Sequence, residues 1–303
     1  MAMSTESPVA KSARLWALEV SRDQAEGLHE FFAAVFGAAA PAGLVQEAIQ
    51  KSATGRLMAV GDDIGPLMLM PFEIAPDASG RVGPPLFHPR GSAIKPEAVA
   101  AAAGHIETLG VDTLHIALAG EEDLADLLLK AGFQRGPTMI EMEGRTPPFA
   151  QPRRADWICY TKGARRLFAK AVYETLENSL DFPEMPVCRD GARLMRAFEK
   201  RGAFSPEDFA LLEIEGAVAG IILVVEHENA LEIAYMGIVR RSRGTGLANV
   251  LVERAAERAR AHAVATIMCT VDSRNAPALA AYRRFGLSEK RAVRVYFHVK
   301  KKS

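Results

Sequence analysis

The chain has 303 residues, which is long for one compact domain, and the common domain size of about 150 residues predicts two domains. Its 49% hydrophobic and 24% charged residues are typical of a globular protein, and no apolar run approaches the ~20 residues needed to span a bilayer. The three cysteines are too widely spaced for a disulfide framework or a metal-binding pair, and the first residues lack the apolar core of a signal peptide. We therefore expect a reduced, cytoplasmic protein.

The net charge of zero conceals an asymmetry between the two parts of the chain. Residues 1–145 hold 11 Lys and Arg against 19 Asp and Glu, whereas the remainder holds 26 against 18. The basic excess predicts that the C-terminal part meets an anion, although chance dispersion together with the basic tail VKKKS would give the same count. No basic stripe with interleaved aromatic residues is present, so we expect no nucleic-acid partner, and we expect no membrane partner either.

The N-terminal part alternates segments with strand and helix periodicity. A strand-like segment is followed by two helical segments, a hairpin-like pair of apolar runs, and then a helix, a strand, a helix and a strand. In chain order the predicted elements are 14–21, 22–36, 42–53, 55–74, 96–110, 112–118, 121–132 and 138–144.

A Pro-rich and basic stretch, residues 143–157, indicates a domain boundary. Beyond it come two helical segments separated by a Pro-broken loop, a meander of three strands, and then a helix, a strand, a helix and a strand. In chain order the predicted elements are 164–179, 190–202, 209–239, 249–263, 265–271, 276–285 and 292–299.

The two parts therefore have nearly the same order of elements. This favours a tandem duplication with domains at 1–146 and 147–303, and two unrelated α/β domains are the alternative. In fold class we expect an α/β (α+β) protein in which each domain has a mixed, mostly antiparallel central sheet flanked by helices.

The stretch RRSRGTGLA, residues 240–248, lies where a predicted strand passes into a predicted helix. Glycine lets the backbone approach a ligand closely, and a helix start offers unpaired N–H groups at the positive end of its dipole. A nucleotide-triphosphatase loop is excluded because no Gly-Lys-Ser/Thr ends the stretch. A dinucleotide-binding fingerprint is disfavoured because Asn249 stands at the third glycine.

The spacing Arg243-x-x-Gly246-x-Ala248 resembles the coenzyme A loop of the GCN5-related N-acetyltransferases, the GNAT family. The segment VDSRNAPALAAYRRFGL, residues 271–287, is similar to a later motif of that family, with an Asn, a helix carrying a Tyr, and an aromatic-Gly pair. The resemblance covers residues 155–300, and the overall layout is similar to tandem acetyltransferases of the mycothiol-synthase kind. Arg240 and Ala248 depart from the family pattern, but neither should abolish amide donation by the loop.

The resemblance implies a site for acetyl-CoA as cosubstrate and no metal. Backbone amides of the loop would hold the pyrophosphate, and Asn275 would contact the pantetheine or pyrophosphate. The strand backbone at Ile238 and Val239 would bind the pantetheine arm, and the Val239 amide would stabilise the thioester oxyanion. The implied loop residues are Arg243, Gly244, Thr245, Gly246, Leu247 and Ala248.

The resemblance also implies roles for two side chains in proton transfer. Tyr282 would protonate the leaving thiolate as general acid, unless it is merely a packed aromatic. Glu232 occupies the strand position of the general base in the histone acetyltransferase branch, but a solvent-facing carboxylate with ordered water as base fits equally well. For Asn275, the role of a plain helix N-cap is compatible with ligand contact.

The N-terminal part lacks the corresponding residues. When Gly132 and Gly286 are aligned, Leu128 stands at the position of Tyr282, and a leucine cannot donate a proton. The segment FHPRGSAIKPEA, residues 87–98, echoes the glycine loop only weakly. We therefore expect a degenerate, non-catalytic repeat that supports the other domain or walls part of its substrate cleft.

Taken together, the residues predict an N-acetyltransferase that moves an acetyl group to a primary amine by direct attack in a ternary complex. A non-catalytic acyl-CoA-binding or regulatory protein and a structural pseudoenzyme are the alternatives. The acceptor would be a small-molecule or peptide amine, and a homodimer stays open. Specificity is expected in the loop NSLDFPEM, where Asp181 and Glu184 would attract a cationic amine or simply be solvated.

Overall fold

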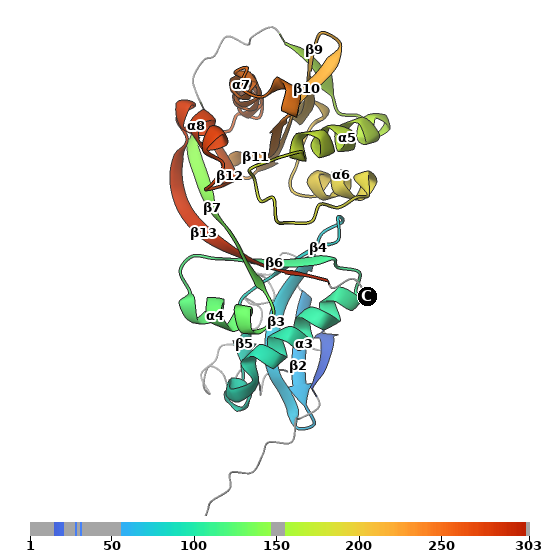
Figure 1. The fold of residues 1–303 in the computed structure, drawn as a ribbon, viewed down its shortest axis with the longest axis vertical. Helices are drawn as coiled ribbons and strands as arrows, with labels where there is room; N and C mark the ends of the chain where they lie inside the picture. Colours follow the sequence, from blue (N-terminus) through green and yellow to red (C-terminus); the bar gives the residue numbers. More distant parts are fainter. Residues whose placement is uncertain (1–14, 21–27, 29–30, 32–55, 147–154, 301–303) are drawn as a thin grey trace, which may run out of the picture.

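The computed structural model describes residues 15–20, 28, 31, 56–146 and 155–300, which form two lobes joined by long strands (Figure 1). Two predicted helices, 22–36 and 42–53, lie almost entirely outside these residues. The N-terminal lobe contains β1 (Trp16–Val20), β2 (Arg56–Asp62), β3 (Gly65–Ile74), β4 (Ser79–Val82), β5 (Leu86–Phe87), the 3-10 helix η2 (Pro89–Ile94), α3 (Lys95–Thr108), β6 (Thr113–Leu118), α4 (Glu122–Lys130) and β7 (Gln134–Arg145).

The C-terminal lobe repeats this order. It contains β8 (Asp156–Cys159), η3 (Lys162–Ala164), α5 (Arg165–Leu176), α6 (Gly191–Glu199), η4 (Pro206–Asp208), β9 (Phe209–Ile214), β10 (Ala217–His227), β11 (Ala230–Ile238), η5 (Arg240–Ser242), α7 (Leu247–Ala261), β12 (Thr266–Asp272), α8 (Ala276–Arg284) and β13 (Ser288–Val299). The predicted fold class is confirmed, with a large and mostly antiparallel sheet that has helices on its faces. No helix within the described ranges is long and apolar enough to cross a membrane.

All the strands belong to one sheet, in which the two lobes exchange their last strands. The order is β1-β2-β3-β4-β6-β13-β7-β12-β11-β10-β9-β8, with β5 paired to β3. Thus β13, the end of the C-terminal lobe, lies between β6 and β7, and β7 pairs with β12 from Thr266–Arg145 to Asp272–Met139. The predicted boundary at 146/147 falls between β7 and β8, and the hydrogen-bonded sheet contains strands from both sides of it.

Helices α5 and α6 cover one face of the C-terminal sheet, and α7 and α8 cover the other (Figure 1). Their apolar sides meet alternate residues of the strands, as a period of two along a strand requires. On β11, Leu231 and Ile233 pack toward α7 and α8, so the side chain of Glu232 between them points to the α5–α6 face.

Strands β11 and β12 are parallel neighbours that separate after a short contact. They pair only from Leu231–Ile267 to Ile233–Cys269, and the β10–β11 register then shifts by one residue, which leaves Ala234 as a bulge. Beyond that point β11 stays paired with β10 up to Ile238, while β12 stays paired with β7 up to Asp272. A gap therefore opens between the carboxyl ends of two adjacent strands.

The strand exchange predicts that the N-terminal repeat does not fold alone. A fragment of residues 1–146 would lack both partners of β7, namely β13 and β12, and one partner of β6. We expect its urea unfolding, followed by circular dichroism, to lack the cooperative transition that the whole chain shows. A sharp transition of the isolated fragment would contradict this expectation.

Candidate active site

The glycine loop follows β11 and ends at the start of α7. Gly244 and Gly246 have φ values of 78° and 83°, in the left-handed region that favours glycine, and Gly246 is the N-cap of α7. A Cβ added at either glycine would meet nothing within 4 Å, so the loop needs these glycines for its backbone course and not for close packing. The sequence located both the loop and the helix start.

The loop presents its backbone amides without using them internally. Within the described residues, none of the five amides from Gly244 to Ala248 donates to a protein acceptor. The Thr245 hydroxyl, by contrast, donates to the Ser242 carbonyl at 2.7 Å and closes the turn from within. Amides grouped at the positive end of a 15-residue helix form a site suited to a phosphate or diphosphate.

The Arg243 side chain does not belong to this anion site. Its guanidinium donates to three carbonyls, those of Ile238 (3.1 Å), Asn178 (3.0 Å) and Thr175 (2.8 Å). It thereby joins the end of β11 to the C-terminal end of α5, where a cation is also favoured by the helix dipole. The Arg243 amide is engaged as well, since it donates to the Arg240 carbonyl at 3.3 Å.

The Val239 amide is not free for the oxyanion role that the sequence suggested. It donates to the Ala219 carbonyl at 3.1 Å, as part of the β10–β11 ladder. Because hydrogen-bonded pairs alternate along an antiparallel ladder, the amides of Met236 and Ile238 point to the opposite edge, which faces the gap. The engagement of the Val239 amide is set by strand register, which the sequence does not reveal.

Tyr282 lies on α8 against the core and next to the gap. It is only 5% exposed, and within the described residues its hydroxyl has no hydrogen-bond partner. Burial raises its pKa well above the ordinary value, and the charges of Cys269 and Asp181 add to this rise. The phenol therefore stays protonated, which is the form that a general acid needs.

Asn275 is engaged by the protein on both sides of its amide. Its oxygen accepts from the Ala278 amide at 3.3 Å and caps α8, as the sequence suggested. It also hydrogen-bonds the Asp181 side chain. Contact between Asn275 and a cofactor stays a prediction.

Glu232 lies on the opposite face of the sheet from Tyr282, and its carboxylate is already paired. One oxygen is 2.5 Å from the Arg201 guanidinium and the other is 2.9 Å from His227 Nε2. The residue is 8% exposed, so it is not the solvent-facing carboxylate of the alternative interpretation. The structure thus brings the loop and Tyr282 to the gap, and it places Glu232 deeper, among cations.

Sequence analysis missed how the loop between α5 and α6 is attached to the end of β12. The Asp272 amide donates to Asp181 at 2.7 Å, and the Phe182 amide donates to the Asp272 carboxylate at 3.1 Å. Arg274 then bridges Asp272 and Glu184, at 2.6 and 2.5 Å. The acidic residues of NSLDFPEM were the only signal, and they cannot reveal a partner 90 residues away.

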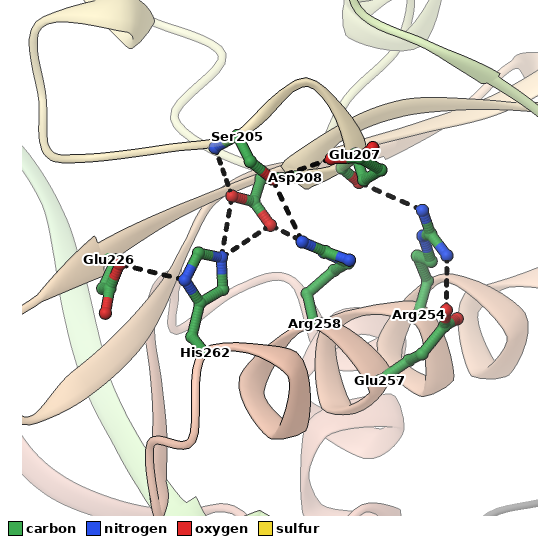
Figure 2. Close-up of polar contacts among 8 residues, drawn as sticks. All are labelled: Ser205, Glu207, Asp208, Glu226, Arg254, Glu257, Arg258 and His262. Carbon is green, nitrogen blue, oxygen red and sulfur yellow. Dashed lines mark hydrogen bonds and ion pairs between the residues drawn. The ribbon is translucent and has the colours of Figure 1, made fainter.

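A buried ionic network holds the C-terminal half of α7 (Figure 2). Asp208, whose side chain has no exposed surface, is 2.7 Å from Arg258 and 2.8 Å from His262. The other nitrogen of His262 is 2.9 Å from Glu226, so both ring nitrogens face carboxylate oxygens. These contacts hold the helix whose other end carries the glycine loop.

The network makes stability depend on the charge of Asp208. Burial raises the pKa of this carboxyl, but hydrogen bonds from the Ser205 amide, Arg258 and His262 outweigh burial and leave the pKa below its ordinary value. A lowered folded-state pKa stabilises the fold above the unfolded-state value of about 4, and this contribution is lost as the pH falls through the folded-state value.

Asp208→Asn should therefore reduce the free energy of unfolding at pH 7 by roughly 3–5 kcal/mol, because it leaves Arg258 buried without its partner. Urea titrations at several pH values check this, and the difference from the wild type should shrink below about pH 4. Asp156→Asn, an exposed position on β8, is the control. An equal loss in both variants would contradict the role of the network.

Comparison with known proteins agrees with this geometry. Residues 170–287 match the family model described as the acetyltransferase (GNAT) family. A GCN5-related N-acetyltransferase from Sphaerobacter thermophilus is 18% identical, with 94% of this chain and 95% of that chain covered and a TM-score of 0.59. A tandem GNAT protein from the clavulanic acid biosynthesis pathway is 15% identical, with 96% and 100% covered and a TM-score of 0.53.

A further GCN5-related N-acetyltransferase, from Kribbella flavida, is 11% identical over 95% of this chain and 71% of that chain, with a TM-score of 0.52. A search of curated proteins finds no match to the sequence. At these identities the structural likeness concerns the fold, which is that of a tandem GNAT protein. The glycine loop, the gap and Tyr282 all lie within the matched segment, and residues 170–287 thus form a domain of the acetyltransferase (GNAT) family.

Proposed function

We propose that the protein transfers an acetyl group from acetyl-CoA to a primary amine by direct attack within a ternary complex. The observation that carries this proposal is the set of five unused amides at the start of α7, next to a gap between diverging strands that Tyr282 borders. At the coenzyme side, such a transfer requires donors that bind an anion and a protonated group, here a phenol, that can give its proton to the sulfur.

The residues present fit a coenzyme A diphosphate. The open space around Gly244 and Gly246 leaves room for a ligand against the loop backbone. A cavity of about 520 Å³ adjoins the loop and is lined by Glu174, Glu177, Val239, Arg240 and Arg241. Bound acetyl-CoA would supply the acetyl group as a thioester, and the amides of Met236 and Ile238 are the edge donors nearest to it along β11.

The two faces of the sheet divide the proton transfers between them. Tyr282, on the α8 face, would donate its proton to the departing sulfur. Glu232, on the α5–α6 face, would accept a proton from the amine, directly or through water, once its contact with Arg201 opens. Burial raises the pKa of Cys269 to about 12, so this thiol is not ionised as an acyl-accepting nucleophile, which favours direct transfer.

A non-catalytic acyl-CoA-binding protein is the second candidate. The observation that favours it is the pairing of the two Glu232 oxygens with Arg201 and His227, which leaves no free side-chain base on that strand. Both candidate functions use the same coenzyme site, so a measurement of turnover distinguishes between them.

Tyr282→Phe tests catalysis. Loss of the proton donor should lower the rate of thiol release by roughly 10²–10⁴-fold, with acetyl-CoA and a set of primary amines as substrates. The acetyl-CoA dissociation constant from calorimetry should stay within about twofold, because no hydrogen bond of the fold is lost. Thiol release that is unchanged in the variant would refute the role of Tyr282 as proton donor. Its absence in the wild type, alongside tight acetyl-CoA binding, would favour the non-catalytic candidate.

Gly246→Val tests the anion site. A β-branched residue at a φ of 83° strains the loop and reorients its amides, so acetyl-CoA affinity should fall about tenfold or more. Gly216→Val is the matched control, since Gly216 also has a positive φ of 76° and open space, but lies in the β9–β10 turn. Equal affinity of the two variants for acetyl-CoA would refute the loop as the coenzyme site.

A further inference from the structure

The loop between α5 and α6 crosses the mouth of the gap between β11 and β12. On the β11 side, Arg243 holds the carbonyls of Thr175 and Asn178 at the beginning of this loop. On the β12 side, the Asp272 amide and carboxylate hold Asp181 and the Phe182 amide. Since β11 and β12 no longer pair with each other at this level, the segment between the two attachments spans the opening (Figure 1).

The charge of the Asp181 carboxyl acts on residues of α8, β12 and β11, the elements beside the gap. After burial, its charge is among the causes that raise the pKa of Tyr282 on α8, of Cys269 on β12 and of Tyr235 on β11. One of these neighbours, Tyr282, is 95% buried and keeps a hydroxyl without a partner among the described residues. Asp181 and Tyr282, two polar groups from different elements, therefore lie close enough for the charge of one to act on the other.

Asp181 differs from the acidic residues beside it in having no direct ion pair among the described residues, although Arg274 lies near enough for its charge to lower the pKa of Asp181. Asp272 and Glu184 share Arg274, but within the described ranges Asp181 has no ion pair and receives only the hydrogen bonds of the Asp272 amide and the Asn275 side chain. Burial raises its pKa, and the neighbouring Asp272 charge adds to the rise. A cation placed beside a half-buried carboxylate with a raised pKa stabilises its charged form.

We propose that Asp181 binds the ammonium group of the amine acceptor, and so selects a cationic primary amine. This inference rests on the proposed function and names its substrate class. The carboxylate keeps acceptor capacity beyond its two existing hydrogen bonds, and an alkylammonium brings three N–H donors. The acceptor nitrogen would then be held at the mouth of the gap, on the face from which it must approach a thioester lying between the strands.

Asp181→Asn tests the role of the charge. The Asn oxygen can still accept from the Asp272 amide, so the loop attachment should persist and the thermal unfolding midpoint should stay unchanged. In a calorimetric titration, n-butylammonium chloride is the probe and is added to the coenzyme A complex of the protein. The wild type should show saturable binding of this probe. The variant should bind the probe at least about tenfold more weakly than the wild type does.

Glu184→Gln is the matched control, because Glu184 is in the same loop but is paired with Arg274 at the surface. It should bind n-butylammonium like the wild type. Equal binding by the wild type and Asp181→Asn would overturn the proposal, and so would the absence of saturable binding to the wild type. If Asp181→Asn does not fold, the carbon-13 carboxyl signal of Asp181 in the wild type must shift on titration with the probe, and a static signal would overturn the proposal.

Failure of this inference can be told apart from failure of the proposed function. Calorimetry of coenzyme A alone reports the loop site, and n-butylammonium titrated into the free protein reports Asp181. Coenzyme A binding without ammonium binding removes only the role of Asp181. Ammonium binding that depends on Asp181, in a protein that does not bind coenzyme A, removes the acetyltransferase proposal and leaves the ammonium site.

Discussion

The divergence of β11 and β12 is the constraint on which the candidate site depends. Two parallel neighbours that paired along their whole length would satisfy each other's amides and leave no opening. Here each strand keeps its other neighbour, β10 or β7, and the bulge at Ala234 turns β11 away after three paired positions. The open edge of β11, the glycine loop that follows it and the loop that crosses the gap all derive their positions from this separation.

The strand exchange gives the N-terminal repeat a structural part in the candidate site. Strand β7 belongs to the N-terminal repeat, yet it holds β12 along one wall of the gap. The N-terminal repeat has Leu128, fully buried in its own core, at the position equivalent to Tyr282, and a 3-10 helix over Pro89–Ile94 where the glycine loop would be. It has lost the chemical groups of the site but keeps the strand that the other repeat cannot supply.

Local features of the site could be predicted from the sequence, and features that depend on register or long-range contact could not. The glycines at 244 and 246 and the N-cap at Asn275 act within a few residues of themselves, so composition and spacing revealed them. The Val239 amide was assigned to a ligand, but it bonds to the carbonyl of Ala219, and the Arg243 side chain bonds to the carbonyl of Thr175. Those partners depend on how α5 and β10 pack against β11, which no short motif encodes.

The same limit applies to the exchanged strands. The predicted segments 138–144 and 292–299 correspond to β7 and β13, but their alternation is equally compatible with pairing inside each repeat or across the two. When two strands have a similar residue pattern, the packing of the whole sheet decides which of them becomes the hydrogen-bonded neighbour. The sequence could therefore predict two repeats of one fold without predicting that they share their last strands.

Helix α7 combines an unsatisfied end with a tightly held end, and the two are physically connected. Its N-terminal amides have no protein acceptor, while Arg258 and His262 in its last turn and C-cap are fixed by Asp208 and Glu226. Cations at the C-terminal end complement the helix dipole, and the buried network removes the freedom of the helix to tilt. An anion at the other end then meets donors that need little reordering, and donors already in place bind more tightly than donors that must first be ordered. The network lies far along the chain from the glycine loop, yet we expect it to strengthen anion binding at the loop through the rigidity of a single helix.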